Sequence, residues 1–321
     1  MRKNKLLLLL ALLMMAATGA WAQDPAKYKI TVAEGTEDFG KWTISPTEAA
    51  EGATVTATYS GEKKVKSVKA VKKGVDPAKA YLTWDADQKK LVATEIPTTA
   101  IKVENADGNV SWAGTYVVED DVTISGTIGL SGEVDLIIKD GATLTAKKIS
   151  GSGNNLRIYG QAQMSGELVV NSSISDAIMS IGTLEVHSAQ VTAASSANSC
   201  GGIYGITTFN VYGGSVDAKG TGAGYGISIN SGGSINIFEG EVKAEGKGTG
   251  NFSFGIKCGN TATVTVYGGQ LWAGNADKQA LHSNVTLQKG EGFTGKIEYS
   301  SDKSTWSETV DADAKYVRAG Y

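Results

Sequence analysis

A file of aromatic side chains at nearly regular spacing is the feature of this chain best suited to chemistry. Each ring follows a short strand-like phrase in the second half of the sequence, at His187, Tyr212, Phe238 and Tyr267. Successive rings lie 25, 26 and 29 residues apart (212−187, 238−212 and 267−238). Flat rings in a row stack on the apolar faces of sugars, since aromatic side chains are large, stiff and lose little entropy when fixed. The spacing therefore indicates a binding surface.

Two repeated strand-like phrases position this file. In the first phrase the apolar residues alternate, as Leu184/Val186, Phe209/Val211, Ile235/Ile237 and Val264/Val266. In the second, a large apolar residue alternates with alanine, as Val191/Ala193, Val216/Ala218, Val242/Ala244 and Leu271/Ala273. Alternate residues of a strand face opposite sides, so we expect these residues to point inward. A fixed period of short strands and Gly-rich turns is typical of a stacked solenoid.

The residues between the inward ones are expected to face outward. One outward file is polar and consists of Glu185, Asn210, Asn236 and Thr265. Tyr159 extends the aromatic file, and Trp272, outward in the second phrase, is expected near its end. Amide groups in the polar file can hydrogen-bond sugar hydroxyls. The expected ligand-binding residues are Tyr159, Tyr212, Phe238, Tyr267, Trp272, Asn210 and Asn236.

Two other interpretations of the aromatic file remain open. The rings form a protein-binding surface, or they only stack on one another beneath a loop or a neighbouring domain. Rings exposed in one row would favour a glycan ligand, whereas rings covered by a loop would favour a structural role.

The repeat predicts an all-β fold, a right-handed parallel β-helix with about 25–29 residues per coil over residues 109–290. Residues 23–108 lack the repeat and predict a small β-sandwich or β-grasp-like module, with strands at 28–32, 41–44, 54–59, 65–71, 81–84 and 90–94. Residues 291–321 predict a C-terminal β-hairpin cap with strands at 296–299 and 316–318, because the ends of a solenoid need covering.

Residues 1–22 predict a signal peptide. Basic residues precede an apolar run at 6–17, and Ala20-Trp21-Ala22 is a cleavage signal that leaves Gln23 first. We therefore expect secretion to a periplasm, a cell surface or the medium, with no membrane span in the mature chain. A formal net charge of −3 gives no general attraction to nucleic acid.

The two cysteines, Cys200 and Cys258, are expected to be free thiols, with a disulfide as the alternative. The repeat places them about two coils apart, and strands stack at about 4.8 Å. Their separation of roughly 9–10 Å exceeds the ~7 Å that a disulfide spans. The only histidines are His187 and His282, so we expect neither a metal site nor a cofactor.

We expect no catalysis. Glycoside hydrolysis needs two carboxylates about 5–10 Å apart, and the nearest pair, Asp217 and Glu241, differs by two repeat positions. The mature chain keeps only Arg157 and Arg318 to assist a calcium-dependent lyase site. A polysaccharide lyase is the remaining enzymatic alternative.

Two parts of the chain carry a family resemblance. The phrases Gly213-Gly214-Ser215-Val216 and Gly268-Gly269-Gln270-Leu271, with the entry phrase at 112–118, resemble secreted β-helix proteins of Bacteroidetes-like bacteria. That resemblance implies a non-enzymatic, carbohydrate-binding surface protein. The segments 42–46, 50–55 and 65–68 resemble an internalin B-repeat, which implies an extracellular spacer or adhesion module. An adhesin or structural surface protein with a host or bacterial protein partner is therefore the alternative function.

Overall fold

In the computed structural model the chain divides into two compact units, residues 1–73 and 74–321. The structure describes residues 27–29, 41–50, 55–61 and 75–321. In the first unit, β1 (Lys27–Lys29) pairs antiparallel with β3 (Glu48–Ala50), and β2 (Trp42–Ser45) pairs antiparallel with β4 (Thr56–Tyr59). The expectation of small N-terminal sheets is confirmed. The expected signal peptide and the expected strand at 65–71 lie outside the described residues.

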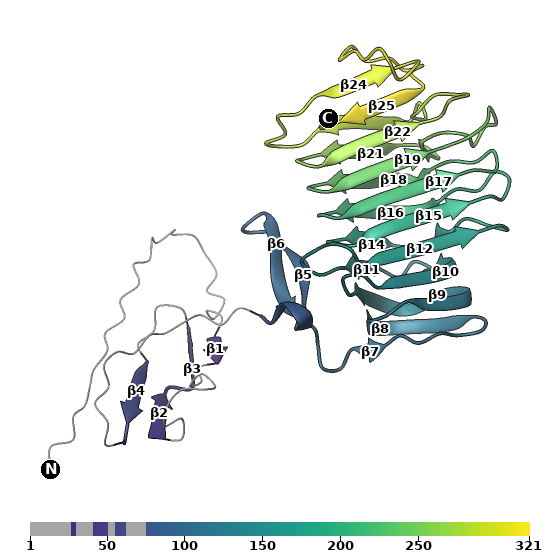
Figure 1. Ribbon diagram of the computed structural model, residues 1–321. Helices are drawn as coiled ribbons and strands as arrows, with labels where there is room; N and C mark the ends of the chain where they lie inside the picture. The colour runs from purple at the N-terminus through teal and green to yellow at the C-terminus, as the bar shows by residue number, and fades with distance from the viewer. Residues whose placement is uncertain (1–26, 30–40, 51–54, 62–74) are drawn as a thin grey trace. The chain divides into compact units, whose positions relative to one another are not determined.

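The second unit is a β-solenoid of about seven turns, as the sequence predicts (Figure 1). Its strands stack in parallel on three faces, which we name A, B and C. Face A stacks β8 (Val110–Val118), β9 (Val122–Ile138), β11 (Leu156–Tyr159), β14 (Thr183–Val186), β16 (Ile203–Val211), β18 (Ile227–Ile237), β21 (Ala262–Val266) and β23 (Val285–Lys289).

Faces B and C complete each coil. Face B stacks β9, β10 (Thr143–Ser150), β12 (Glu167–Ser172), β15 (Gln190–Ser195), β17 (Ser215–Gly220), β19 (Glu241–Glu245) and β22 (Gln270–Gly274). Face C stacks β8, β9, β10, β13 (Ile178–Met179), β16, β18 and β20 (Ile256–Cys258). Five strands turn corners between faces: β8, β10, β16 and β18 each contribute to two faces, and the long strand β9 contributes to all three.

Ladders of inward side chains fill the solenoid, as predicted. On face A, Leu184, Phe209, Ile235 and Val264 are in register and fully buried. On face B the register aligns the four large apolar residues with one another and the four alanines with one another. Each buried large apolar side chain contributes about 1.5–3 kcal/mol. The repeat period therefore specifies the core directly.

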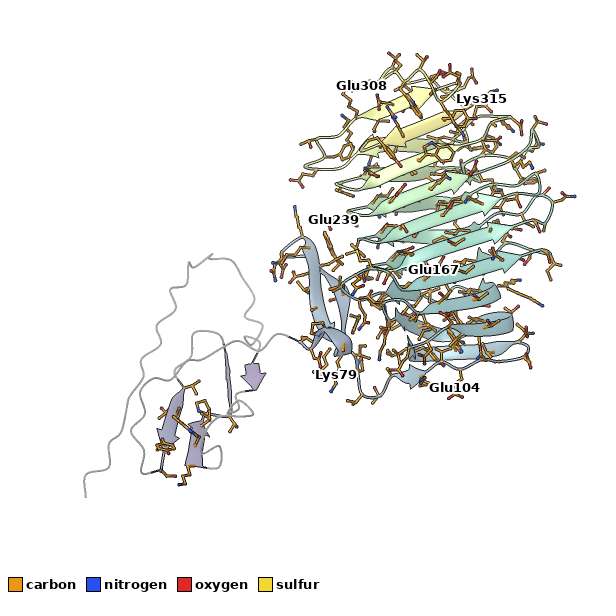
Figure 2. The ribbon with its side chains drawn as sticks, viewed as in Figure 1. Lys79, Glu104, Glu167, Glu239, Glu308 and Lys315 are labelled. Carbon is orange, nitrogen blue, oxygen red and sulfur yellow. The ribbon has the colours of Figure 1, made fainter. Side chains whose placement is uncertain are left out.

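At each end of the solenoid one face is paired with a further strand. At the start, β7 (Ile101–Lys102) pairs parallel with β8. At the other end, β25 (Tyr316–Ala319) pairs antiparallel with both β22 and β24 (Ile297–Ser300). β24 and β25 pair antiparallel to form a hairpin at this end, and Figure 2 labels Glu308 and Lys315 on this cap. Pairing the last strand of face B removes an open edge that would invite association.

A second hairpin packs on the side of the solenoid. It consists of a short 3-10 turn, η2 (Pro77–Lys79), followed by β5 (Ala80–Asp85) and β6 (Lys90–Glu95), which pair antiparallel. Figure 1 shows it beside face A, and Lys79 marks its base in Figure 2. The sequence groups these strands with residues 23–108, whereas in the structure they belong to the compact unit of the solenoid.

The cysteine prediction holds. Cys258 is buried, Cys200 is half-buried, and both are free thiols. Cys258 lies in face C, where its Sγ donates to the backbone oxygen of Asn284 at 3.3 Å.

Candidate functional site

The structure brings five of the predicted rings into one continuous stack, the aromatic column. Neighbouring centroids lie 4.5, 4.7, 4.9 and 4.7 Å apart in the order Tyr159, His187, Tyr212, Phe238 and Tyr267. These distances match the spacing of stacked strands, about 4.7–4.9 Å. The rings of the last two pairs, Tyr212 with Phe238 and Phe238 with Tyr267, are nearly parallel, with interplanar angles of 15° and 7°. Face A therefore presents one ring per coil.

Backbone hydrogen bonds at the end of each face A strand set this spacing. The amide of every ring residue after the first donates to a carbonyl of the preceding coil, from His187 to Ile158, Tyr212 to Val186, Phe238 to Val211 and Tyr267 to Ile237. The bond lengths are 2.8 to 2.9 Å. Since each ring follows the last inward residue of its strand, the side chains leave the sheet in the same direction.

The β5–β6 hairpin covers most of the aromatic column. Tyr81 packs edge-on against Tyr159 with centroids 4.9 Å apart. Trp84 stacks on Tyr212 at 5.3 Å and lies 5.6 Å from Phe238. Tyr159 and His187 are consequently only 7% and 6% exposed. The column is a docking surface for the chain's own hairpin, which corresponds to the covered arrangement that the sequence left open.

Polar contacts fix the register of the hairpin on the column. The Leu82 amide donates to the Gly160 carbonyl at 2.9 Å, and the Trp84 amide donates to His187 Nδ1 at 3.0 Å. Gln161 Nε2 donates to the Ala80 carbonyl at 2.8 Å. The hairpin is thus held by backbone groups as well as by rings.

Small residues directly after the rings make room for the hairpin. A Cβ at Gly213 would lie 2.8 Å from Leu91 Cδ1 and 2.6 Å from the His187 carbonyl oxygen. Gly160 and Ser188 occupy the corresponding positions on earlier coils. This run of small residues is the sequence signal that could have identified the covered face.

His187 acts as an acceptor within the column. Because Nδ1 accepts the Trp84 amide, the neutral ring carries its proton on Nε2, an assignment made from the hydrogen bond. Nε2 is buried without a hydrogen-bond partner and lies 3.6 Å from Glu185 Oε2. A phenylalanine at this position would offer the Trp84 amide no acceptor.

We expect His187→Phe to weaken hairpin docking although it preserves the stack. The variant leaves the Trp84 amide without its acceptor, which costs about 1–3 kcal/mol for a buried donor. Hydrogen exchange at the Trp84 amide measures the loss. Tyr212→Phe is the matched control, since it removes only a hydroxyl on the same column. Equal Trp84 protection in both variants would mean that the His187 bond does not hold the hairpin.

The predicted polar file forms a hydrogen-bonded ladder beside the column. Asn210 Nδ2 donates to Glu185 Oε1 at 3.1 Å, and Asn236 Nδ2 donates to Asn210 Oδ1 at 3.0 Å. Burial, followed by the Glu185 carboxylate, raises the pKa of Tyr212 to about 12, so its hydroxyl stays protonated beside Glu185. Asn210 and Asn236 therefore already use part of their hydrogen-bonding groups within the ladder.

Trp272 lies apart from the column. It belongs to β22 on face B, where its ring is 6.0 Å from that of Tyr316 in the C-terminal cap. The ammonium groups of Lys243 and Lys303 each lie 5.3 Å from its centroid. Two Gly residues turn the chain between Tyr267 and β22. Trp272 therefore faces outward from face B, whereas Tyr267 faces outward from face A.

Face C carries a second group of aromatic residues that sequence reasoning missed. In register along this face lie Tyr204, Ser228 and Lys257, one per coil. Tyr204 is 39% exposed, and Phe252, from the loop before β20, is 49% exposed. Together with Tyr225, these residues form what we call the face C surface.

The face C surface has a fixed base. Tyr225 is buried, and its hydroxyl donates to Asp176 Oδ1 at 2.6 Å. Its ring lies 6.1 Å from Tyr204 and 4.4 Å from Lys257 Nζ. Lys257 Nζ also lies 4.6 Å from the Phe252 centroid. The Lys257 ammonium is thus held between the buried ring of Tyr225 and the exposed ring of Phe252.

The sequence could not reveal this surface from its period. Tyr225 and Phe252 come from turns between strands, and those turns differ in length from coil to coil. Only Tyr204 and Lys257 occupy strand positions that the repeat defines.

Comparison with known proteins gives no match. No family model matches the chain, and no curated protein or solved structure is significantly similar to it. Within the described residues, no three His, Cys, Asp or Glu side chains gather closely enough to hold a metal ion. The same residues contain no helix long and apolar enough to cross a membrane. Function therefore has to be inferred from the geometry of the chain's own residues.

Proposed function

We propose that this chain is a non-enzymatic, secreted or surface-exposed glycan-binding protein of the bacterial β-helix type. The observation that carries the proposal is the open face C surface, where Tyr204 on β16 and Phe252 on the loop before β20 are exposed and Lys257 lies against the Phe252 ring. Exposed rings offer flat apolar contact to sugars at low entropic cost.

The site of binding in this proposal differs from the one that the sequence indicated. Tyr159 and His187 are buried beneath the hairpin, so a sugar would have to displace Tyr81 and Trp84 to reach them. Tyr267 has a ring contact only with Phe238 among the described residues, so the end of the column stays a candidate for glycan binding. The aromatic column otherwise serves to dock the hairpin.

The arrangement of the carboxylates favours binding over catalysis. Asp217 is level with Lys243, whereas Glu241 is level with Ser215. Asp217 Oδ2 pairs with Lys219 at 2.5 Å, and Glu241 accepts the Tyr321 hydroxyl at 3.2 Å. Each carboxylate of the predicted pair is thus engaged with a different partner, and the two residues differ by two positions in the strand register.

The covered column favours a second candidate, an adhesin or structural surface protein with a protein partner. A solenoid braced by its own hairpin is a stiff spacer, and the resemblance of residues 42–68 to an internalin B-repeat agrees with that role. This candidate needs no open aromatic platform, so the two functions differ in what a glycan array would detect.

A broad polysaccharide array tests the proposal. We expect the protein to bind at least one glycan, and Tyr204→Ala with Phe252→Ala to abolish that binding without unfolding the chain. Tyr267→Ala is measured alongside. Binding lost only with Tyr267→Ala would place the glycan at the end of the column instead. An array without any bound glycan would reject glycan binding and leave the adhesin.

A further inference from the structure

The face C surface continues into a cluster of basic side chains. His282 follows Leu281, which bridges Ile256, so the imidazole is one coil beyond Lys257 in the same outward file. The His282 ring packs edge-on against Phe254, with the ring centroids 4.9 Å apart. Lys278 Nζ lies 4.2 Å from the centroid of the same Phe254 ring. Three basic side chains therefore lie close together: Lys257 from β20, Lys278 from the segment after β22, and His282 from the last coil.

These three basic groups lack carboxylate partners. Among the described residues, neither lysine nor His282 forms an ion pair, although the chain as a whole carries a net charge of −3. The carboxylate that acts on Lys257 is that of Asp176, which is buried and already accepts the Tyr225 hydroxyl and the Gly201 amide. A local excess of positive charge on an acidic protein is complementary to an anionic ligand.

The pKa values of His282 and Lys257 are consistent with an anionic ligand at this position. Burial, and after it the charges of Lys257 and Lys278, lower the pKa of His282 below its usual range. Burial also lowers the pKa of Lys257, against the opposing effect of Asp176. A bound carboxylate would relieve the repulsion among these groups.

We propose that the face C surface binds an acidic polysaccharide, with a uronic acid carboxylate between Lys257 and His282 and the sugar ring against Phe252. This inference rests on the proposed glycan-binding function and names its ligand class. The cation supplies the charge-assisted contact, and the exposed ring supplies the stacking surface. The carboxylate stabilises charged His282, so binding strengthens as the pH falls through the pKa of that histidine.

A matched pair of polymers tests the charge requirement. Polygalacturonate and its fully methyl-esterified form share one backbone and differ in the carboxylate. We expect the protein to bind polygalacturonate at least about tenfold more tightly in calorimetric titration. Lys257→Met should weaken that binding about 10- to 100-fold, and Phe252→Ala about three- to tenfold. Lys289→Met is the control, because Lys289 also lies over a ring, that of Phe293, at 5.9 Å.

The outcomes separate this inference from the proposed function. Equal affinity for the two polymers, or equal losses in Lys257→Met and Lys289→Met, would overturn the acidic site while glycan binding stands. Failure to bind these polymers and every glycan on the array would overturn both.

A second readout does not depend on any variant at the site. The chain has two histidines, so their ring signals can be followed individually by NMR, with His187→Phe giving the assignment. We expect oligogalacturonate to raise the pKa of His282 and the methyl ester to leave it unchanged. A pKa of His282 that is the same with and without the acidic oligomer would exclude the carboxylate from this position.

Discussion

Trp84→Ala is expected to release the β5–β6 hairpin while the solenoid stays folded. The indole stacks on Tyr212 and Phe238, and its loss leaves the centre of the covered column without a partner. Truncating a large aromatic residue costs about 3–5 kcal/mol in a full core. Trp84 is half-buried, so we expect a loss of about 2–4 kcal/mol in hairpin docking.

Native-state hydrogen exchange measures this release directly. The Leu82 amide, which donates to Gly160, should lose protection, whereas the His187 amide within face A should keep it. Lys90→Ala is the control, because Lys90 is an exposed residue of β6. Unchanged protection of Leu82 would show that the rings do not hold the hairpin. Loss of protection throughout face A would show that the solenoid depends on it.

Phe209→Ala is expected to be the most destabilising single truncation in the inward ladders. Its side chain is fully buried on face A, between Leu184 on one coil and Ile235 on the next. Burial on all sides leaves little scope for collapse, so the expected loss in free energy of unfolding is about 3–5 kcal/mol. Coils contact only their neighbours, so the cavity weakens the link between the two halves of the solenoid.

Urea unfolding followed by circular dichroism measures the Phe209 effect. Thr207→Ala in the same strand is the control, since Thr207 is exposed. Its loss should be within about 0.5–1 kcal/mol. Similar losses in both variants would contradict the inward assignment of the ladder. A Phe209→Leu variant should recover most of the stability, because the cavity that it leaves is smaller.

The core of the solenoid could be predicted because its signal is local and repeated. Leu184, Phe209, Ile235 and Val264 each occupy the same position in a phrase of four residues, and a strand has only two sides. The same logic gave the ring stack, since one ring per coil must lie one strand spacing from the next. Neither inference needs knowledge of contacts between distant segments.

The covering of the column could not be predicted from that period. Trp84 and Tyr212 are 128 residues apart (212−84), and the strands of the hairpin do not share the repeat. An outward ring looks the same in sequence whether solvent or a hairpin lies over it. The face C surface was missed for a related reason, because Tyr225 and Phe252 come from turns of irregular length. Trp272 was grouped with the column because alternation alone does not say where a coil turns to its next face.

The position of the hairpin has a mechanical consequence. Tension applied to the chain from its N-terminal side enters the second unit at residue 74 and reaches β5 before any coil. The load then falls on the bonds from Leu82 to Gly160 and from Trp84 to His187, which join the hairpin to two different coils. Such a load would therefore reach two coils through the hairpin before it reached the first strand of the solenoid. The docked hairpin therefore gives such a load two points of attachment on face A of the solenoid.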